Sequence, residues 1–394
     1  MIWYALLFFA LLLGQILRFE TLGAAVMGLD LVIFFLFIRN IFSIKNFIFR
    51  KEEKIIPPLS LFILIALLSL FIYSFSLTSG QTIISLLYLV RFILYCSIYF
   101  ITKRYIAKQQ ISKNFLNNGL LLAGLGVALL GFIQLIFYPD IRNLYYLGWD
   151  PHFGRLVSTT FDPNFTGIIL VMAFFLSLNQ IIFNKNKKRI FYFIVSIILF
   201  IALVFTYSRS SYLALTIGLL SWGALQNKVK YSLVFITILA LAIFIVPKPQ
   251  GEGGKLTRTS TTSARVTSWY QSVILWRKSP VIGFGFNTLA FVKEKYQLLP
   301  LTNNSYPNHA AAGADNSLLF VLLTTGLVGL GSFCWLIWEI FKKLSFDKVY
   351  LPFFSSVLIH SLFQNTLFFP QVLVFLFLVL TLIPYGRFKK VQNI

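Results

Sequence analysis

Long apolar runs recur along almost the whole chain, and they constrain its fold more than any other feature. A helix needs about 20 mostly apolar residues to cross the hydrocarbon core of a bilayer, and about twelve runs approach that length. They lie at residues 2–17, 22–38, 57–75, 82–101, 116–138, 164–183, 190–206, 210–225, 231–246, 316–340, 350–366 and 370–385. Because 58% of the residues are hydrophobic and only 12% are charged, no soluble core could bury this surface. The sequence therefore predicts an all-α integral membrane protein.

The positions of Lys and Arg predict which loops face the cytoplasm. If the amino terminus lies inside, the inward segments hold 21 Lys and Arg; these segments are 39–56, 102–115, 184–189, 226–230, 341–349 and the tail after 385. The short loops on the other side hold only Arg18, Arg142, Arg155 and Arg209. The positive-inside rule then predicts that both termini are cytoplasmic. The first apolar run lacks a basic segment and a small-residue cleavage site, so we interpret it as a retained span.

The net charge of +22 and the two cysteines carry little further functional information. A nucleic-acid partner is not expected, because no basic arm on a foldable soluble domain is present, and topology and contact with anionic lipids explain the loop lysines. Cys96 and Cys334 lie inside apolar runs, where cysteine behaves as a small hydrophobic residue. The sequence contains no zinc-site spacing and no phosphate-binding loop, and its three histidines are scattered. We therefore predict no metal and no cofactor.

One long hydrophilic segment, residues 247–315, divides the chain. We expect a membrane domain over residues 1–246, a large extracytoplasmic loop over 247–315, and a second membrane domain with a cytoplasmic tail over 316–394. Long translocated loops are largely exempt from the positive-inside rule, so the charges of this segment do not oppose its assignment outside. From Ser263 onward, apolar residues recur at helical spacing: Val266, Trp269, Tyr270, Val273, Ile274 and Trp276. This pattern predicts an amphipathic helix at the outer membrane surface, with Arg265 in its first turn.

Arginine on the outer side is the most suggestive chemical feature. Arg209 stands in "FTYSRSSYL" between two apolar runs, and Arg265 opens the loop helix. Arginine presents a rigid fork of donors that matches phosphate oxygens, so a cluster of outer arginines suits an anionic lipid head group. Simpler explanations remain: Arg209 is equally explained as a span-end residue that snorkels to the interface, and Arg265 as a contact to phospholipid. The hydroxyl neighbours of Arg209, among them Ser208, are equally explained as helix caps.

Two further sets of polar residues lie in or next to predicted spans. Arg91 falls near the middle of a span, where a charge usually serves a site or pairs with an acid, and Asp30 is its predicted partner. Asp315 precedes the span that follows the loop, where an acid often caps a helix. Alternatively, Asp315 or nearby His309 acts as a general base that removes a proton from a sugar hydroxyl.

Three segments in the second half of the chain together resemble the O-antigen ligase and polymerase superfamily. They are "TYSRSSYLAL" at 206–215, "ARVTSWYQSVILWRKSPVIGFGFNTL" at 264–289 and "DNSLLFVLLTTGLVGL" at 315–330. "RLVSTTFDPNFTGIIL" at 155–170 is similar to the family segment that precedes a middle span. The resemblance extends over residues 155–345, and elsewhere it rests on topology. It implies a fold of about twelve spans with interfacial helices in one outer loop, like that of multi-spanning (GT-C-like) glycosyltransferases.

The resemblance implies a metal-independent glycosyltransferase of the bacterial inner membrane, with its active site facing the periplasm or exterior. The expected donor is an undecaprenyl-pyrophosphate-linked oligosaccharide, and the acceptor is a hydroxyl of another glycan. By resemblance, Arg209 and Arg265 hold the donor pyrophosphate. From the residues themselves we expect Asp315 or His309 to be catalytic and Arg91, Arg155 and Ser208 to be auxiliary. Membrane lipids and other polysaccharide assembly proteins are the further partners that we expect.

The chain departs from the ligase pattern at one position. Ligases of this family carry His followed by Asn at the start of the span after the loop, whereas this chain has Asp315 followed by Asn316. The difference favours polymerisation, in which the acceptor is another lipid-linked repeat unit, over ligation to lipid A core or to a protein. A transporter or flippase with twelve spans is a further alternative, but carriers usually place their site near the bilayer midplane between two related halves.

Overall fold

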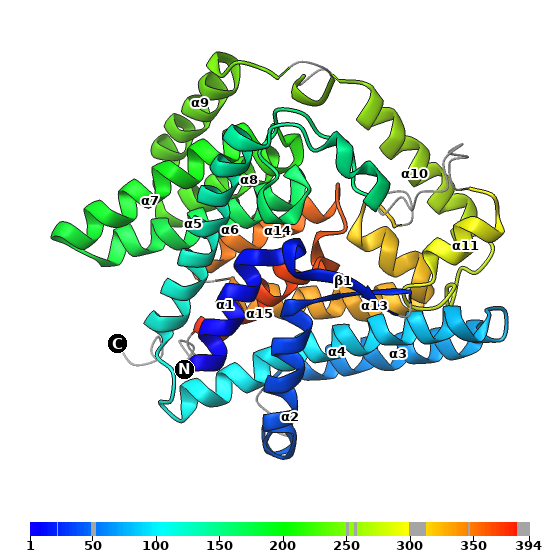
Figure 1. The fold of residues 1–394 in the computed structure, drawn as a ribbon. Coiled ribbons are helices and arrows are strands. Elements are labelled where there is room, and N and C mark those ends of the chain that lie inside the picture. The colour runs from blue at the N-terminus through cyan, green and yellow to red at the C-terminus, as the bar shows by residue number, and fades with distance from the viewer. Residues whose placement is uncertain are drawn as a thin grey trace.

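The computed structural model describes residues 1–21, 23–48, 53–249, 252–255, 258–298, 313–345 and 347–383. These residues form one mostly helical body (Figure 1). The first half contains α1 (Ile2–Leu13), β1 (Arg18–Thr21), β2 (Ala24–Met27), α2 (Gly28–Ile48), α3 (Ile56–Ser74), α4 (Ser79–Ala107), α5 (Lys113–Phe137) and α6 (Pro163–Phe183). The second half contains α7 (Asn186–Phe205), α8 (Arg209–Gln226), α9 (Val229–Ile245), α10 (Ser260–Trp276), α11 (Leu289–Lys295), α13 (Ser317–Leu344), α14 (Tyr350–Ser361) and α15 (Pro370–Leu382).

Within the described residues, six helices are long and apolar enough to cross a membrane: α3, α4, α5, α6, α7 and α13. Their bounds agree with six of the predicted spans to within about two turns. The other predicted spans correspond to α1, α2, α8, α9, α14 and α15, which are shorter or more polar. An all-α membrane protein is therefore confirmed, whereas the number of twelve spans stays a prediction. The division into two membrane domains and one large loop also stays a prediction.

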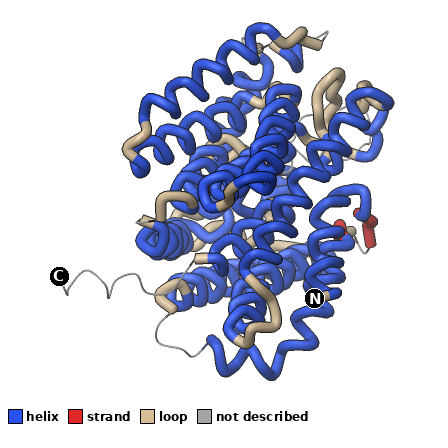
Figure 2. The backbone as a smooth tube through the Cα atoms, turned by 90° about the vertical axis from the view of Figure 1, so that its left-hand side faces the viewer, coloured by secondary structure: helices blue, strands red, loops and turns tan. Residues whose placement is uncertain are grey.

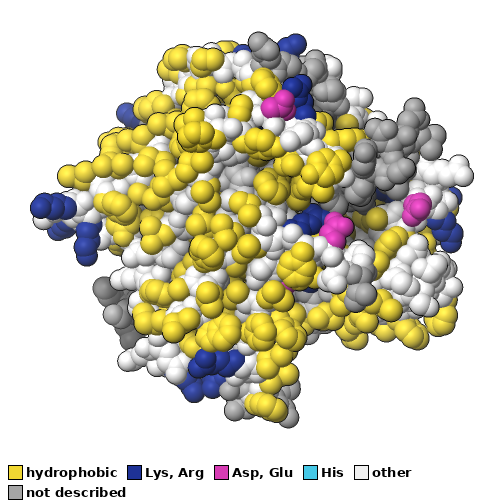
Figure 3. Space-filling view, viewed as in Figure 1, with side chains coloured by type: hydrophobic (Ala, Val, Ile, Leu, Met, Phe, Trp, Pro, Cys, Tyr) yellow, Lys and Arg dark blue, Asp and Glu magenta, His cyan; other side chains and the backbone are white. Residues whose placement is uncertain are grey.

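Large apolar side chains cover much of the outside of the molecule. Phe71 is 64% exposed, Phe137 is 79% exposed and Phe183 is 74% exposed. In the space-filling view hydrophobic side chains occupy most of the visible face, and Lys and Arg lie mostly at its edges (Figure 3). A soluble protein rarely exposes so large a contiguous apolar surface, whereas contact with lipid tails accounts for it.

The predicted span 22–38 begins six residues later than expected. Residues 18–21 and 24–27 form the two strands of an antiparallel hairpin instead, in which Arg18 pairs with Met27 and Thr21 pairs with Ala24. The two strands lie together at one edge of the molecule (Figure 2). The hairpin bends at Gly23, whose φ of +75° is in the left-handed region that glycine adopts without strain. Helix α2 then starts at Gly28, because Asp30 in its first turn accepts the backbone N–H of Met27 at 2.7 Å.

Helix α6 lies at the centre of the bundle. Of its most apolar 18-residue stretch, 72% is buried, and the helix packs against α5, α7, α8 and α14. Its first turn is capped by Asp162, whose carboxylate accepts the N–H groups of Asn164 and Phe165. The cap therefore fixes where α6 starts, and the ends of the neighbouring helices are arranged around this position.

The loop segment after α10 is bound to a break in α13. At Gly326 the backbone leaves helical geometry with φ +66°, so carbonyls that precede the break need other partners. The N–H groups of Phe284 and Gly285 donate to the carbonyls of Leu323 and Thr324, both at 2.9 Å. A Cβ on Gly283 would come within 2.6 Å of the α13 backbone, so only glycine fits. The close glycines of "VIGFGF" thus join the loop to α13 rather than merely forming a turn.

Candidate functional site at the outer helix ends

The turn between α7 and α8 places Arg209. Tyr207 has φ +50°, and Ser208 follows as the N-cap of α8, where its hydroxyl accepts the N–H of Ser211. The Ser208 hydroxyl also donates to Oδ1 of Asn164 at 2.8 Å, which ties the start of α8 to the start of α6. The capping interpretation of Ser208 is therefore confirmed, and its buried hydroxyl faces protein groups. Arg209 is the first residue of α8, at the end of this turn.

Two buried arginines hold the same turn from the loop side. Arg155 donates from Nε to the carbonyl of Thr206 at 3.0 Å and from a terminal nitrogen to the carbonyl of Tyr207 at 3.2 Å. Arg258 also donates to Tyr207, at 3.4 Å. Burial, and then the charge of Arg258, lower the pKa of Arg155 to about 9. Because carbonyls at the end of α7 carry partial negative charge, Arg155 supports the turn on which Arg209 stands.

Arg209 joins this turn to the loop helix. Its guanidinium donates to the carbonyl of Arg258 at 3.2 Å and to the hydroxyl of Thr262 in α10 at 3.2 Å. Helix α10 begins at Ser260, so Arg265 lies in its second turn and not in the first turn as expected. The positive charge of Arg209 contributes to lowering the pKa of Arg265. The structure therefore brings the two predicted arginines close to each other.

Asp315 lies on the other side of Arg265. Helix α10 packs against α13, which brings Arg265 and Ser268 of α10 near Asp315. Burial raises the pKa of Asp315, while the charges of Arg265 and Lys293 act in the opposite direction. Lys293 of α11 is itself buried and donates to the carbonyl of Gly313. Asp315 is thus set between two cations at the junction of three helices.

The N-cap of α13 is Asn316 and not Asp315. The Asn316 side chain accepts the N–H groups of Leu318 and Leu319, and its amide donates to the carbonyl of Leu362 at 3.0 Å. The capping explanation for Asp315 is therefore wrong, and its carboxylate is turned toward α10 and α11. His309, the other predicted base, lies outside the described residues.

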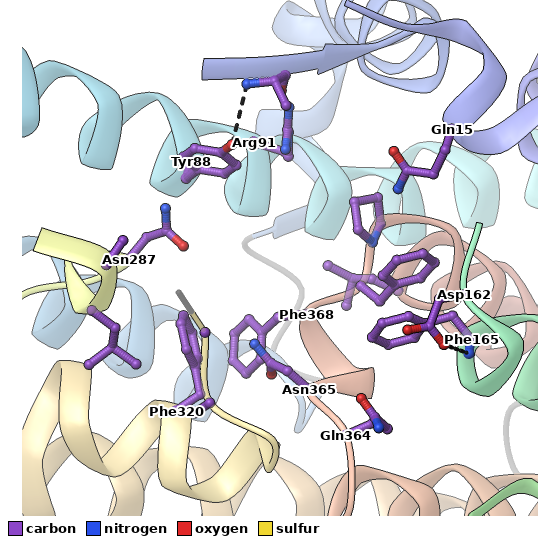
Figure 4. Close-up of a pocket in the computed structure, with 18 of the residues that line it drawn as sticks. Gln15, Tyr88, Arg91, Asp162, Phe165, Asn287, Phe320, Gln364, Asn365 and Phe368 are labelled. Atoms are coloured by element: carbon purple, nitrogen blue, oxygen red, sulfur yellow. Dashed lines mark hydrogen bonds between the residues drawn. The ribbon is translucent and has the colours of Figure 1, made fainter. Parts of the chain in front are cut away.

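A cavity of about 550 Å³ opens beside Asp315. Three carboxylates line it, those of Asp150 and Asp162 from the loop between α5 and α6 and that of Asp315 from the segment before α13. Its apolar wall is mainly aromatic and comprises Phe165, Phe286, Phe320, Phe368 and Phe369 among others. Figure 4 shows Phe320 and Phe368 on one side of the open space, with Asp162 and Phe165 on another and Arg91 across from them. The cavity therefore combines anionic and polar groups with a broad apolar surface.

Arg91 lines this cavity and is also ion-paired. It contacts Asp30 at 2.8 Å, which confirms the predicted pair, and Asp30 also accepts a hydrogen bond from the hydroxyl of Tyr95. Arg91 donates as well to the carbonyl of Ala25 in the hairpin. Arg91 lines the cavity and Asp30 does not, so only the arginine of the pair contributes to the cavity wall.

Two sets of residues near the site were not predicted from the sequence. Asp150, His152 and Asp162 each bring a ligand atom within 4.8 Å of the others. His360 of α14 is fully buried, and its Nε2 lies 3.1 Å from the Ser210 hydroxyl and 3.3 Å from the Ser211 hydroxyl. The only sequence signal for the first set was two acids and a histidine within one outer loop. Contacts between distant helices create the second.

The fold and the site together define a class of protein. Apolar helices form a multi-pass, all-α membrane protein, and its arginines and carboxylates gather where the ends of α6, α7, α8, α13 and α14 meet α10 and the loop 138–162. A family model described as O-antigen ligase matches residues 194–334, which include Arg209, Arg265 and Asp315.

A curated relative agrees with the family match. The chain is 24% identical over 186 residues to an O-antigen ligase of Salmonella typhimurium. That alignment covers 44% of this chain and 45% of the relative, so the chain spans less than half the length of the relative that it matches. The resemblance to the O-antigen ligase and polymerase superfamily is therefore confirmed.

Proposed function

We propose that this protein is a membrane glycosyltransferase that moves a glycan from a polyprenyl pyrophosphate to an acceptor sugar hydroxyl. The observation that carries the proposal is the contact of Arg209 with the start of α10, where its guanidinium donates to the hydroxyl of Thr262, three residues before Arg265. Two guanidinium groups at short range repel, and an anion between them relieves that repulsion. Arginine fits pyrophosphate oxygens with paired hydrogen bonds, which supports a pyrophosphate as the bound anion.

The cavity beside the arginines suits the rest of such a donor. An aromatic wall accommodates apolar chain and sugar faces, and carboxylates accept hydrogen bonds from sugar hydroxyls. A lipid-linked glycan presents all three features: an apolar tail, a pyrophosphate and a polyol. We therefore propose an undecaprenyl-pyrophosphate-linked oligosaccharide as the donor. The acceptor is another glycan, one hydroxyl of which is glycosylated.

The proposed transfer proceeds by attack of an acceptor oxygen on the reducing-end carbon of the donor glycan. The bond from that carbon to the pyrophosphate oxygen breaks, and polyprenyl pyrophosphate leaves. Arg209 and Arg265 stabilise the charge that develops on the leaving group, so the proposal assigns that role to no metal ion. Asp315 takes the proton of the acceptor hydroxyl, and its raised pKa makes it a stronger base than an exposed aspartate.

Between two acceptors we favour another lipid-linked repeat unit, which makes the protein a polymerase. The acid at position 315, where ligases of the family carry histidine, supports this choice. Ligation to lipid A core is the second candidate, because the family model and the curated relative are both described as O-antigen ligases. In either case we propose that the protein lies in the bacterial inner membrane with this site on the periplasmic side and both termini in the cytoplasm.

The experiment that tests the function is a gel profile of surface polysaccharide in a deletion strain. Single repeat units on the lipid core would indicate a missing polymerase, and unattached lipid-linked polymer would indicate a missing ligase. An unchanged profile would contradict the proposal. Accumulation of lipid-linked units on the cytoplasmic leaflet would favour a flippase instead.

A further inference from the structure

The loop between α5 and α6 brings three metal-ligating side chains together. A carboxylate oxygen of Asp150, a ring nitrogen of His152 and a carboxylate oxygen of Asp162 all lie within 4.8 Å of one another. Metal–ligand distances of about 2.0 to 2.6 Å allow two ligands of one ion to lie up to about 5 Å apart. One ion can therefore contact all three groups with little movement of the loop.

The loop backbone fixes this arrangement from both sides. The N–H of Ile141 donates to the carbonyl of His152 at 3.1 Å, and the N–H of Gly154 donates to the carbonyl of Pro139 at 2.9 Å. The ring of Trp149 meets the ring of Phe161 edge to face at 5.3 Å between centroids. Trp149 directly precedes Asp150, and Phe161 directly precedes Asp162. The ring contact therefore holds the two carboxylates together although eleven residues lie between the aspartates.

The ring of His152 supplies an independent indication of a binding site. Its Nε2 is buried and has no hydrogen-bond partner among the described residues. A buried polar nitrogen without a partner is costly, because it has lost its contact with water. Asp162 uses one carboxylate oxygen, Oδ1, to cap α6, which leaves Oδ2 as its second acceptor atom.

Positive charge also lies close to the cluster. The charges of Arg155 and Arg258 are felt at His152, and that of Arg155 is also felt at Asp150. The hydrogen bonds of Arg155, however, go to two carbonyls of the α7–α8 turn. The cavity wall also contains three carboxylates whose negative charges repel one another, those of Asp150, Asp162 and Asp315. Two aspartates beside one imidazole offer an oxygen-rich, mixed ligand set, which is characteristic of a divalent cation such as Mn²⁺.

We propose that Asp150, His152 and Asp162 form a divalent-cation site in the wall of the cavity. The proposal goes beyond the glycosyltransferase function and does not depend on it. The ion would join the loop to the start of α6 and leave open coordination positions for water or ligand oxygens.

The test is the binding of Mn²⁺ to the purified full-length protein in detergent, after treatment with EDTA and removal of the chelator. Calorimetry is expected to show one saturable site per chain. Loss of a partner that only orients a ligand costs about 10- to 100-fold in metal affinity, so Asp150→Asn and His152→Gln are each expected to weaken binding at least about tenfold. Asp140→Asn is the matched control, because Asp140 lies in the same loop but pairs with exposed Arg142.

A spectroscopic measurement on the wild-type protein keeps the test independent of how the variants fold. Electron spin-echo spectroscopy of bound Mn²⁺ is expected to show nitrogen modulation from an imidazole, and His152→Gln is expected to remove it. The proposal is overturned if the wild type shows no saturable Mn²⁺ binding up to millimolar concentration. It is equally overturned if bound Mn²⁺ shows no nitrogen modulation, or if the folded Asp150 and His152 variants bind like the Asp140 control.

Discussion

Arg265 and Asp315 interact electrostatically across the junction of α10 and α13, so the loop helix and the span after it form one charged site. Burial raises the pKa of Asp315, and the charge of Arg265 and the hydroxyl of Ser268, both on α10, act in the opposite direction. Arg265 also lies above the ring of Phe363, 6.0 Å from its centroid. Asp315 and Arg209 are thus both among the charges that act on the Arg265 guanidinium.

The first prediction concerns the arginines. Arg209→Ala and Arg265→Ala are each expected to lower the rate of glycan transfer by about 10² to 10³, the usual effect of losing one group that stabilises developing negative charge. Lysine is expected to restore only part of the rate, because it keeps the charge but not the fork of donors. The measurement is transfer by protein reconstituted in vesicles. Exposed Arg277, which directly follows α10, is the control, and Arg277→Ala should retain wild-type transfer.

The second prediction separates the roles of two neighbouring residues. Asp315→Asn is expected to abolish most transfer while leaving thermal stability unchanged, because the N-cap of α13 is Asn316. Asn316→Ala is expected to lower stability by about 1 kcal/mol through loss of that cap. Paired melting and transfer assays measure both. If Asp315→Asn melted early and transferred normally, Asp315 would be a structural residue.

The third prediction concerns pH. A base must be deprotonated, so transfer is expected to rise as pH increases through the raised pKa of Asp315, and this acidic limb should be absent in any residual activity of Asp315→Asn. Five effects set the pKa of Asp315 among the described groups: burial and the charge of Asp162 raise it, and Arg265, Lys293 and the hydroxyl of Ser268 lower it. Lys293→Met should therefore move the limb to higher pH. If Lys293→Met left the acidic limb of the pH profile where it is, the group that titrates there would not be Asp315.

The fourth prediction assigns a structural role to Arg155. Replacing Arg155 by Met removes its hydrogen bonds to the carbonyls of Thr206 and Tyr207, of which Tyr207 keeps Arg258 as a donor. Loss of the donor to a buried carbonyl costs about 1 to 3 kcal/mol. A clear drop in melting temperature is expected. Arg142→Gln is the control, because exposed ion pairs contribute at most about 1 kcal/mol. If the two variants melted at the same temperature, Arg155 would not stabilise the α7–α8 turn.

The fifth prediction concerns the break in α13. Gly326→Ala places a side chain at φ +66° and within 2.1 Å of the carbonyl oxygen of Val281, so backbone must move. We expect strong destabilisation and separation of the loop from α13. Gly331→Ala is the matched control, because a Cβ at Gly331 meets nothing within 4 Å. Protease sensitivity of the loop and melting temperature provide the readouts, and equal results for both glycines would contradict the account.

Hydropathy alone predicted most of the helices, because a bilayer imposes length and apolarity on each span. It failed at residues 22–27, where Gly23 and Asp30 favour a hairpin and a later helix start, features that an average over a window conceals. Arg209, Arg265 and Asp315 were predicted individually, and the structure brings them together. The roles proposed for them remain predictions.

The rest of the site could not be read from the sequence, because it depends on contacts between distant segments. Arg155 looked like an outer arginine available to a ligand, yet burial commits it to the α7–α8 turn. The Asp150, His152 and Asp162 cluster depends on the contact between Trp149 and Phe161. The cavity wall draws residues from the hairpin, three loops and several helices, and no single segment displays that pattern.

The most direct test of the central claim is the binding of a polyprenyl pyrophosphate to purified protein in the presence of EDTA, which removes any contribution from a bound cation. Farnesyl pyrophosphate is a soluble probe, and farnesol is its control without charge. Hydrogen bonds to charged groups contribute about 1.5 to 3 kcal/mol, so Arg209→Ala and Arg265→Ala should each weaken pyrophosphate binding by about 10- to 100-fold and leave farnesol binding unchanged. Wild-type affinity in both folded variants would contradict the assignment of these two arginines to the pyrophosphate.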